Sequence, residues 1–129
     1  MLPFPIKIQP GEPIYEQIAH AVKRSIAAGR LQPGDRFPAV RTISKELNIN
    51  PNTVQKAVSE LTGQRFLEVH AGQGCFVAPQ PGSRREIQTE ALRPLIERLL
   101  IEAAHHGVTE DQLLKLIQSE RSKLHGHRN

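Results

Sequence analysis

The stretch INPNTVQKAVSELTG, residues 49–63, constrains the fold more than any other part of the chain. It contains Asn50, a strong helix N-cap residue, followed by Pro51, which suits the first helical position because its missing N–H would be unpaired there. Four apolar residues then recur at i, i+3, i+4 and i+7: Val54, Ala57, Val58 and Leu61. The pattern predicts a helix with a fixed start and one face packed against a core.

The opposite face of this predicted helix is polar. It carries the side chains of Asn52, Gln55, Lys56 and Ser59, with Thr53 at its edge. Amide, hydroxyl and ammonium groups at this spacing can hydrogen-bond to base edges and phosphates in a DNA major groove. A polar face is also what any solvent-exposed helix shows, so this segment by itself leaves both interpretations open.

The neighbouring segments favour DNA binding. Upstream, AVRTISKEL has the apolar spacing of a helix and ends at Leu47, and Asn48-Ile49-Asn50 is the short break before Pro51. This gives a helix, a tight turn and a second helix. Downstream, FLEVHAGQGCFVA alternates and turns at Gly72 and Gly74, which predicts a two-stranded hairpin. A helix-turn-helix followed by a hairpin is a winged helix.

Composition sets broad limits on the class of protein. A chain of 129 residues with 38% hydrophobic content has room for one domain, or for a small domain with an appendage. A net charge of +4 fits a nucleic-acid partner without requiring one. The absence of Trp argues against an aromatic platform for single-stranded bases. We expect a cytoplasmic protein without membrane contact, because neither a signal peptide nor a spanning stretch is present.

Proline, glycine and charge patterns divide the chain into five predicted parts. These are an N-terminal extension at 1–12, a winged helix at 13–78, a linker at 79–83, a helical dimerisation region at 84–124 and a frayed tail at 125–129. In the extension, Ile6-Lys7-Ile8 can form a short edge strand between prolines. In the winged helix, a first helix starts at Pro13 and ends near Gly29.

The C-terminal region reads as two helices. The first runs from Arg84 to His106, with a kink or a fresh start at Pro94, and ends at Gly107. Thr109 and Gln112 form a capping-box pair for the second. Two apolar stripes result: Leu92, Leu95, Ile96, Leu99, Leu100 and Ala103 on the first helix, and Leu113, Leu114, Leu116 and Ile117 on the second.

Two short helices cannot bury both stripes against each other, so the remaining apolar face is best covered by a copy of itself or by the preceding domain. Of these two, we expect a symmetric homodimer built on the stripes. About fifty residues past the linker also leave little room for an enclosed pocket of roughly 300–1,000 Å³. We therefore expect no large effector cavity inside this region, and an effector is unknown from the sequence.

The residues from Pro13 to Val77 resemble the winged-helix domain of GntR-type bacterial transcription regulators. The resemblance rests on five motifs: PIYEQI, G-x-L-x-P-G-D-R-x-P, R-x-x-x-x-E-L, N-x-N-P-N-T-V and G-x-G-x-F-V. The short helical tail is similar to that of the YtrA-like branch, which dimerises through two C-terminal helices. The resemblance implies a sequence-specific regulator, a repressor that binds a palindromic operator in double-stranded DNA as a dimer.

In this family an arginine of the second helix, the start of the recognition helix and a glycine at the wing tip approach DNA. Together with the polar helix face, the resemblance gives the predicted DNA-binding residues: Arg41, Asn50, Pro51, Asn52, Thr53, Gln55, Lys56, Gly72 and Gln73. The peptide N–H groups at the start of the recognition helix would suit a phosphate oxygen.

The chain departs from the family pattern at several positions. The wing reads His70-Ala71-Gly72-Gln73, without the Lys or Arg that is common there, so we expect weaker and less salt-sensitive minor-groove contact. Arg65 replaces the glycine that usually ends the recognition helix, which predicts a left-handed residue or a different turn. Cys75 stands where Thr is frequent, and Ala39 gives the second helix no side-chain cap.

The sequence gives little indication of a metal site, an active site or a cofactor. His105-His106 are neighbours on a helix and His125-Gly126-His127 lie in the predicted tail, so no four-ligand metal set is expected. No nucleophile, phosphate loop or paired carboxylates suggest an enzyme, and no cofactor is expected. Two alternatives to a repressor stay open: a winged helix that binds proteins instead of duplex DNA, and the N-terminal part of a longer enzyme-fused regulator.

Overall fold

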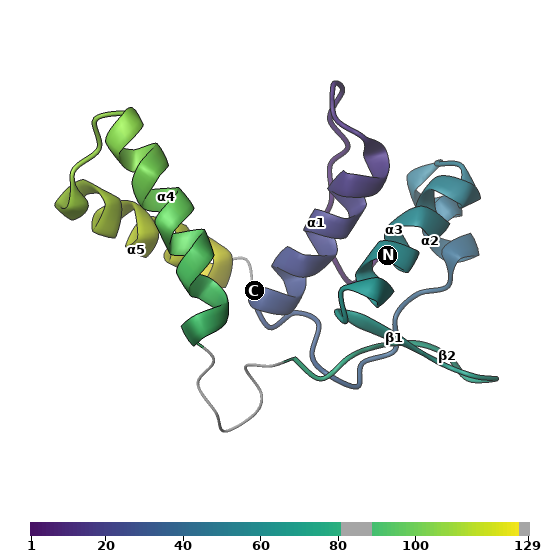
Figure 1. The fold of residues 1–129 in the computed structure, drawn as a ribbon. Helices are drawn as coiled ribbons and strands as arrows, with labels where there is room; N and C mark the ends of the chain where they lie inside the picture. The colour runs from purple at the N-terminus through teal and green to yellow at the C-terminus, as the bar shows by residue number, and fades with distance from the viewer. Residues whose placement is uncertain (81–88, 127–129) are drawn as a thin grey trace. The chain divides into compact units, whose positions relative to one another are not determined.

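The structure is a computed structural model that describes residues 1–80 and 89–126, which form two compact units on either side of the gap. The first unit holds α1 (Ile14–Ala27), α2 (Val40–Leu47), α3 (Pro51–Gly63), β1 (Leu67–His70) and β2 (Gly74–Val77). The second holds a 3₁₀ helix, η2 (Thr89–Leu92), followed by α4 (Arg93–His105) and α5 (Glu110–Gly126). The described chain is mainly α with one small antiparallel hairpin, which confirms the predicted fold class (Figure 1).

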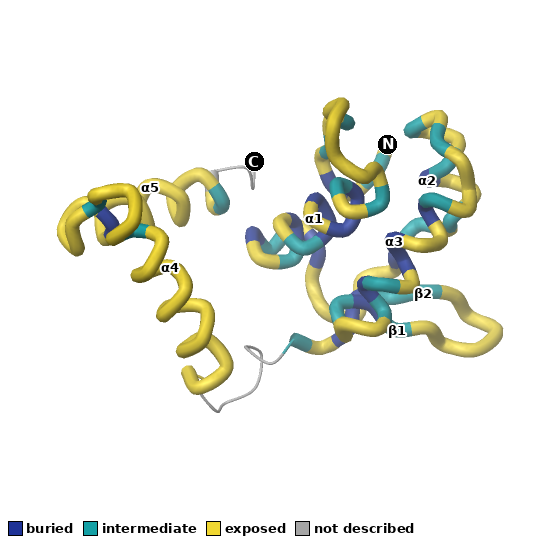
Figure 2. The backbone as a smooth tube through the Cα atoms, turned by 45° about the horizontal axis from the view of Figure 1, so that its top comes forward, coloured by how far each residue is buried: buried dark blue, intermediate teal, exposed yellow. Residues whose placement is uncertain are grey.

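The predicted apolar stripe of α3 forms the centre of the first unit. Its four members are buried, with exposed fractions between 0% and 7%. Ile18 and Val22 of α1 close over it from one side, and Leu67 and Val77 at the base of the hairpin close over it from another. Figure 2 shows this division, with buried segments on the inner faces of the helices and an exposed hairpin tip. The core thereby holds α3 with its polar face outward.

The N-terminal extension forms no strand, so the edge strand considered at Ile6-Lys7-Ile8 is wrong. The side-chain amide of Gln17 in α1 takes the place of a strand partner: it accepts from the Gln9 N–H and donates to the Gln9 carbonyl, both at 2.8 Å. Phe4 is buried and its ring stacks on Phe37 at 5.8 Å between centroids. The extension is therefore anchored to the first unit by side chains.

The second unit begins with a short 3₁₀ turn and restarts as an α-helix at Arg93, with Pro94 in its first turn. The capping box is confirmed, since the Thr109 N–H donates to Gln112 Oε1 at 2.9 Å and the Gln112 N–H donates to Thr109 Oγ1 at 3.2 Å. The predicted fraying from residue 125 is wrong for His125 and Gly126, which belong to α5. Residues 84–88 of the predicted first helix, and residues 127–129, lie outside the described residues.

This unit buries little of its apolar surface. Among its described residues, Leu113 is the one buried hydrophobic side chain, at 8% exposure. The large apolar side chains of α4 and α5 are 40% to 59% exposed: Leu95, Ile96, Leu99, Leu100, Ile101, Leu114, Leu116 and Ile117. The two helices also make few contacts with each other.

Candidate DNA-binding surface

The turn between α2 and α3 fixes where α3 begins. Asn48 adopts a left-handed conformation (φ 54°) that ends α2. The Ser44 hydroxyl then donates to the Ile49 carbonyl at 2.5 Å, and the Ile49 N–H donates to the Ser44 carbonyl at 3.1 Å. Asn tolerates this backbone conformation better than most residues. The residue therefore allows the sharp reversal that a helix-turn-helix requires.

Asn50 caps α3 with its side chain. Its Oδ1 accepts from the Asn52 N–H at 2.8 Å, and its backbone carbonyl accepts from the Thr53 N–H at 3.0 Å. Pro51 has no N–H to offer. These peptide groups, which the sequence suggested for a phosphate, are thus already hydrogen-bonded within the chain. Asn50 and Pro51 thus position the helix, and the side chains on its outer face remain the candidate DNA-binding groups.

The outer face of α3 presents neutral polar groups. Asn52 and Gln55 are exposed and Thr53 is half-buried. The Gln55 amide donates to the Ser59 hydroxyl at 3.1 Å, one turn further along. This bond holds the amide along the helix and uses one of its two N–H donors. The other N–H and the carbonyl oxygen could form the paired hydrogen bonds by which Gln recognises adenine.

Lys56 has a partner in α1 that the sequence did not reveal. Its ammonium lies 4.1 Å from the centroid of the Tyr15 ring, within the range of a cation–π contact. The Tyr15 hydroxyl donates to Glu16 at 3.2 Å, and this carboxylate raises the pKa of Tyr15 above its usual value, so the ring stays neutral. Lys56 is thereby held toward α1, at one side of the polar face.

Arg41 lies exposed in the first turn of α2, one helix away from the polar face of α3. Its helix has Ala39 at the N-cap and no side-chain cap hydrogen bond, as expected. The fully buried Ile43 anchors the same turn. The position of the Arg41 backbone is therefore set by the core, while its side chain reaches into solvent.

The wing is an antiparallel pair with Leu67 opposite Val77 and His70 opposite Gly74. Its loop is closed by the Gln73 N–H, which donates to the His70 carbonyl at 2.9 Å. Gly72 is exposed with φ +75°, a conformation that glycine adopts at little cost. The loop thus presents bare backbone at its tip.

A residue outside the predicted set, Arg36, reaches this loop. Its Nη2 donates to the Gln73 carbonyl at 2.7 Å, and its guanidinium lies 5.7 Å from the centroid of Phe76. The G-D-R motif of the connector was noted in the sequence, but nothing in its spacing indicated contact with the hairpin.

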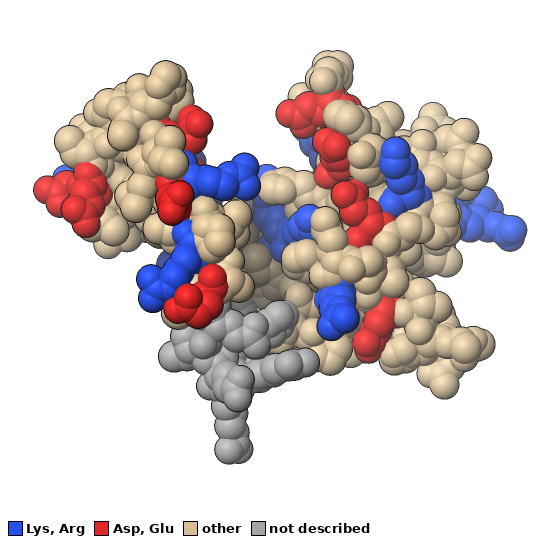
Figure 3. Space-filling model, viewed as in Figure 1, with Lys and Arg blue, Asp and Glu red and all other residues tan. Residues whose placement is uncertain are grey.

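Charge is unevenly spread over the first unit. Residues 1–80 carry nine Lys or Arg and six Asp or Glu, a net +3. Figure 3 shows acidic side chains gathered over the N-terminal part of α1 and basic side chains over the neighbouring helices. On this face of the unit the basic side chains do not merge into one continuous patch.

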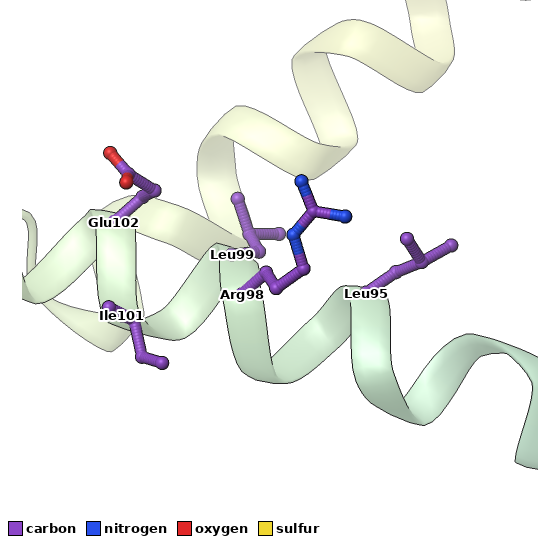
Figure 4. Close-up of a pocket in the computed structure, with 5 residues that line it drawn as sticks. All are labelled: Leu95, Arg98, Leu99, Ile101 and Glu102. Carbon is purple, nitrogen blue, oxygen red and sulfur yellow. The ribbon is translucent and has the colours of Figure 1, made fainter.

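The second unit contains an open pocket of about 400 Å³ on α4, lined by Leu95, Arg98, Leu99, Ile101 and Glu102. In Figure 4, Arg98 and Leu99 point toward α5 while Ile101 points away. All five residues come from one helix and are exposed. The pocket is an open part of the exposed surface of α4 and is not an enclosed cavity.

The part of the chain that the structure describes has neither a metal-binding cluster nor a membrane-spanning helix. No group of three or more His, Cys, Asp or Glu is arranged to hold a metal ion there. His105, the last residue of α4, and His106, which follows it, have rings that lie edge to face with centroids 5.2 Å apart. No helix in the described ranges is long and apolar enough to cross a membrane.

Comparison with known proteins identifies the family. Residues 14–77 match the model for bacterial regulatory proteins of the gntR family. The chain is 31% identical over 124 residues to the HTH-type transcriptional repressor YtrA of Bacillus subtilis (strain 168), covering 94% of this chain and 95% of YtrA.

Solved structures support this assignment. A transcriptional antiterminator from Listeria monocytogenes EGD-e aligns over 98% of this chain and 95% of its own, with a TM-score of 0.79 and 27% identity. The DNA-binding domain of AraR in complex with operator ORR3 aligns over 57% of this chain and 89% of its own, with a TM-score of 0.50 and 26% identity. The chain belongs to the GntR family, a family of helix-turn-helix transcription regulators rather than of enzymes, and resembles its short YtrA-like members.

Proposed function

We propose that this protein is a repressor that binds a palindromic operator as a homodimer. The observation that carries the proposal is the placement of α3, whose apolar stripe is buried and whose start is capped by Asn50 while Asn52 and Gln55 remain exposed. Neutral amides on a rigid helix can hydrogen-bond to base edges in the major groove. Arg41 is the candidate cation beside them, and Gly72 with Gln73 is the candidate wing tip.

The proposal that α3 reads DNA is supported by a relative. The AraR DNA-binding domain was solved with operator DNA, and its match to this chain is a match of DNA-binding domains. Repression is proposed because the relative YtrA is described as a repressor.

The dimer is supported by the second unit. Nine large hydrophobic side chains between Leu92 and Ile117 are at least 40% exposed. An apolar surface of this kind on a small helical unit is best covered by a copy of itself, because burial contributes about 25 cal/mol per Å². A two-fold dimer would present two copies of α3 to two half-sites, which is why a palindrome is expected.

The test is selection of duplexes from a random-sequence library by the full chain, followed by sequencing. We expect an enriched palindrome with half-site centres about 34–36 Å, one helical turn, apart. Binding to it should weaken steeply with salt. A reporter gene that carries the selected sequence in its promoter should be expressed less when the protein is present.

The alternative, a winged helix that binds another protein, predicts a different result. No duplex would be enriched, and any weak binding would be the same for all sequences. Enrichment of a single half-site by a monomer would contradict the dimeric part of the proposal and leave DNA recognition intact.

A further inference from the structure

The hairpin of the wing has no lysine or arginine of its own. Residues 67–77 contain no Lys or Arg and one acidic residue, Glu68. The Glu68 carboxylate lies 3.0 Å from Nε2 of His70, on the exposed face of the hairpin. A wing with this composition attracts phosphates weakly by itself, so a cation from another segment beside it would strengthen its contact with DNA.

The connector before α2 brings Arg36 alongside β2. Arg36 forms an antiparallel bridge with Phe76, which places both residues at the same level of the sheet. The bridge is framed by two backbone hydrogen bonds, from the Phe37 N–H to the Cys75 carbonyl at 2.8 Å and from the Val77 N–H to the Asp35 carbonyl at 2.9 Å. Arg36 therefore starts from a fixed backbone position next to the hairpin.

The side chain of Arg36 extends past Gly74 to the wing tip. It crosses Gly74, where an added Cβ would lie 3.3 Å from Nη2, and it ends at the Gln73 carbonyl, 2.7 Å away. On the way its guanidinium lies against the ring of Phe76. A larger residue at Gly74 would crowd this path.

A guanidinium has five N–H donors in a rigid planar fork. The bond to Gln73 uses one edge, and Arg36 is exposed. Remaining donors can therefore bind an anion while the group stays attached to the loop. The bond to a carbonyl does not neutralise the charge, so the wing tip carries a positive charge that its own sequence lacks.

We propose that Arg36 is the phosphate-binding residue of the wing, held at the wing tip by the Gln73 carbonyl and the Phe76 ring. The ligand is the sugar–phosphate backbone of duplex DNA beside the groove that Gly72 approaches. This inference rests on the proposed function, and it adds a residue from the connector to the DNA-binding surface.

The experiment compares the full-length wild type with Arg36→Gln, Arg36→Lys and Arg24→Gln on the duplex selected by the wild type. Fluorescence anisotropy over a range of salt concentrations gives the affinity and the slope of log K against log salt. Arg36→Gln removes the charge and leaves a shorter polar side chain, whereas Arg36→Lys keeps the charge on a side chain of similar length. Arg24→Gln removes the same charge from the last turn of α1, away from the wing. Circular dichroism checks that each variant is folded.

We expect Arg36→Gln to bind about tenfold more weakly and to lose about 0.9 from the salt slope, the value for one phosphate contact. Arg36→Lys should keep the slope of the wild type, and so should Arg24→Gln. An unchanged slope in Arg36→Gln would overturn the proposal while the wild type still binds its operator. An equal loss in Arg36→Lys would also overturn it, because the cause would then be the shape of the wing. If the wild type binds no duplex at all, the proposed function itself fails and this assignment fails with it.

Discussion

Arg41 extends into solvent from a turn whose backbone is fixed by the buried Ile43. Replacing Arg41 with Ala should weaken DNA binding without loss of stability, because this side chain is exposed and is not part of the hydrophobic core. If Arg41 reads a base, the loss should be about 1–3 kcal/mol and confined to the operator. If it binds a phosphate, all duplexes should lose affinity and the salt slope should fall by about one.

Anisotropy with the operator and with a scrambled duplex separates these two outcomes for Arg41. Lys45→Ala is the matched control, since it removes the same charge from the last turn of α2. Wild-type affinity of Arg41→Ala on both duplexes would remove this residue from the DNA-binding surface.

Gly72 is exposed, but its left-handed backbone conformation limits which substitutions can test the role of the wing tip. An added Cβ would meet nothing within 4 Å, yet φ is +75°, so Val would strain the backbone as well as add bulk. Asn accepts left-handed conformations at a lower cost. We therefore expect both Gly72→Val and Gly72→Asn to weaken operator binding if the tip enters a groove. If Gly72→Asn binds like the wild type, the bulk of the side chain is irrelevant and the tip does not approach DNA.

At the scale of one element, the backbone at the end of α3 is strained at Arg65, and a substitution can relieve this strain. Arg65 has φ +65°, and the helix ends with the Phe66 N–H donating to the Leu61 carbonyl at 2.9 Å and the Arg65 N–H donating to the Thr62 carbonyl at 3.1 Å. This is the Schellman arrangement, in which glycine is preferred at the left-handed residue. The prediction of a left-handed residue here is confirmed.

Arg65→Gly should raise the free energy of unfolding by about 0.5–1 kcal/mol, because relief of the left-handed strain exceeds the added entropy of the unfolded chain. Thermal and urea unfolding measure the change. Gln64→Gly is the control: residue 64 has φ −88°, so glycine there should destabilise the domain. Equal effects from the two variants would show that backbone conformation is not the cause.

At the scale of the whole molecule, we expect the uncovered apolar faces of α4 and α5 to form the interface of a homodimer. Leu99→Asp together with Ile117→Asp should give monomers in light scattering, because two charges would be buried in the interface without partners. The winged helix should remain folded by circular dichroism, since its core is contained within residues 1–80.

Ser119→Asp serves as the control for this pair, because it introduces the same group at an exposed polar position of α5. A wild-type chain that is monomeric at micromolar concentration would contradict the dimer. Monomers should also bind the palindrome weakly, since each would offer one α3 to two half-sites.

The sequence by itself determined the features that depend on neighbours a few residues apart. The cap and apolar stripe of α3 and the capping box at Thr109 each follow from short-range spacing, and the structure contains all of them. Helical periodicity and capping are local, so a single sequence is enough to predict them. The family resemblance added the roles of these elements in DNA binding.

Tertiary structure decided the contacts between segments that are distant in the chain. Arg36 and Gln73 are 37 positions apart, and Lys56 meets Tyr15 only because α1 packs on α3. In the same way, the Gln17 amide of α1, and not a strand partner, bonds the backbone of the N-terminal extension. The Asn50 side chain accepts from the Asn52 N–H, a group that was expected to bind a phosphate. The packing of the elements decides which side chains form hydrogen bonds or contacts across long distances in the chain. Periodicity in the sequence does not predict these pairs.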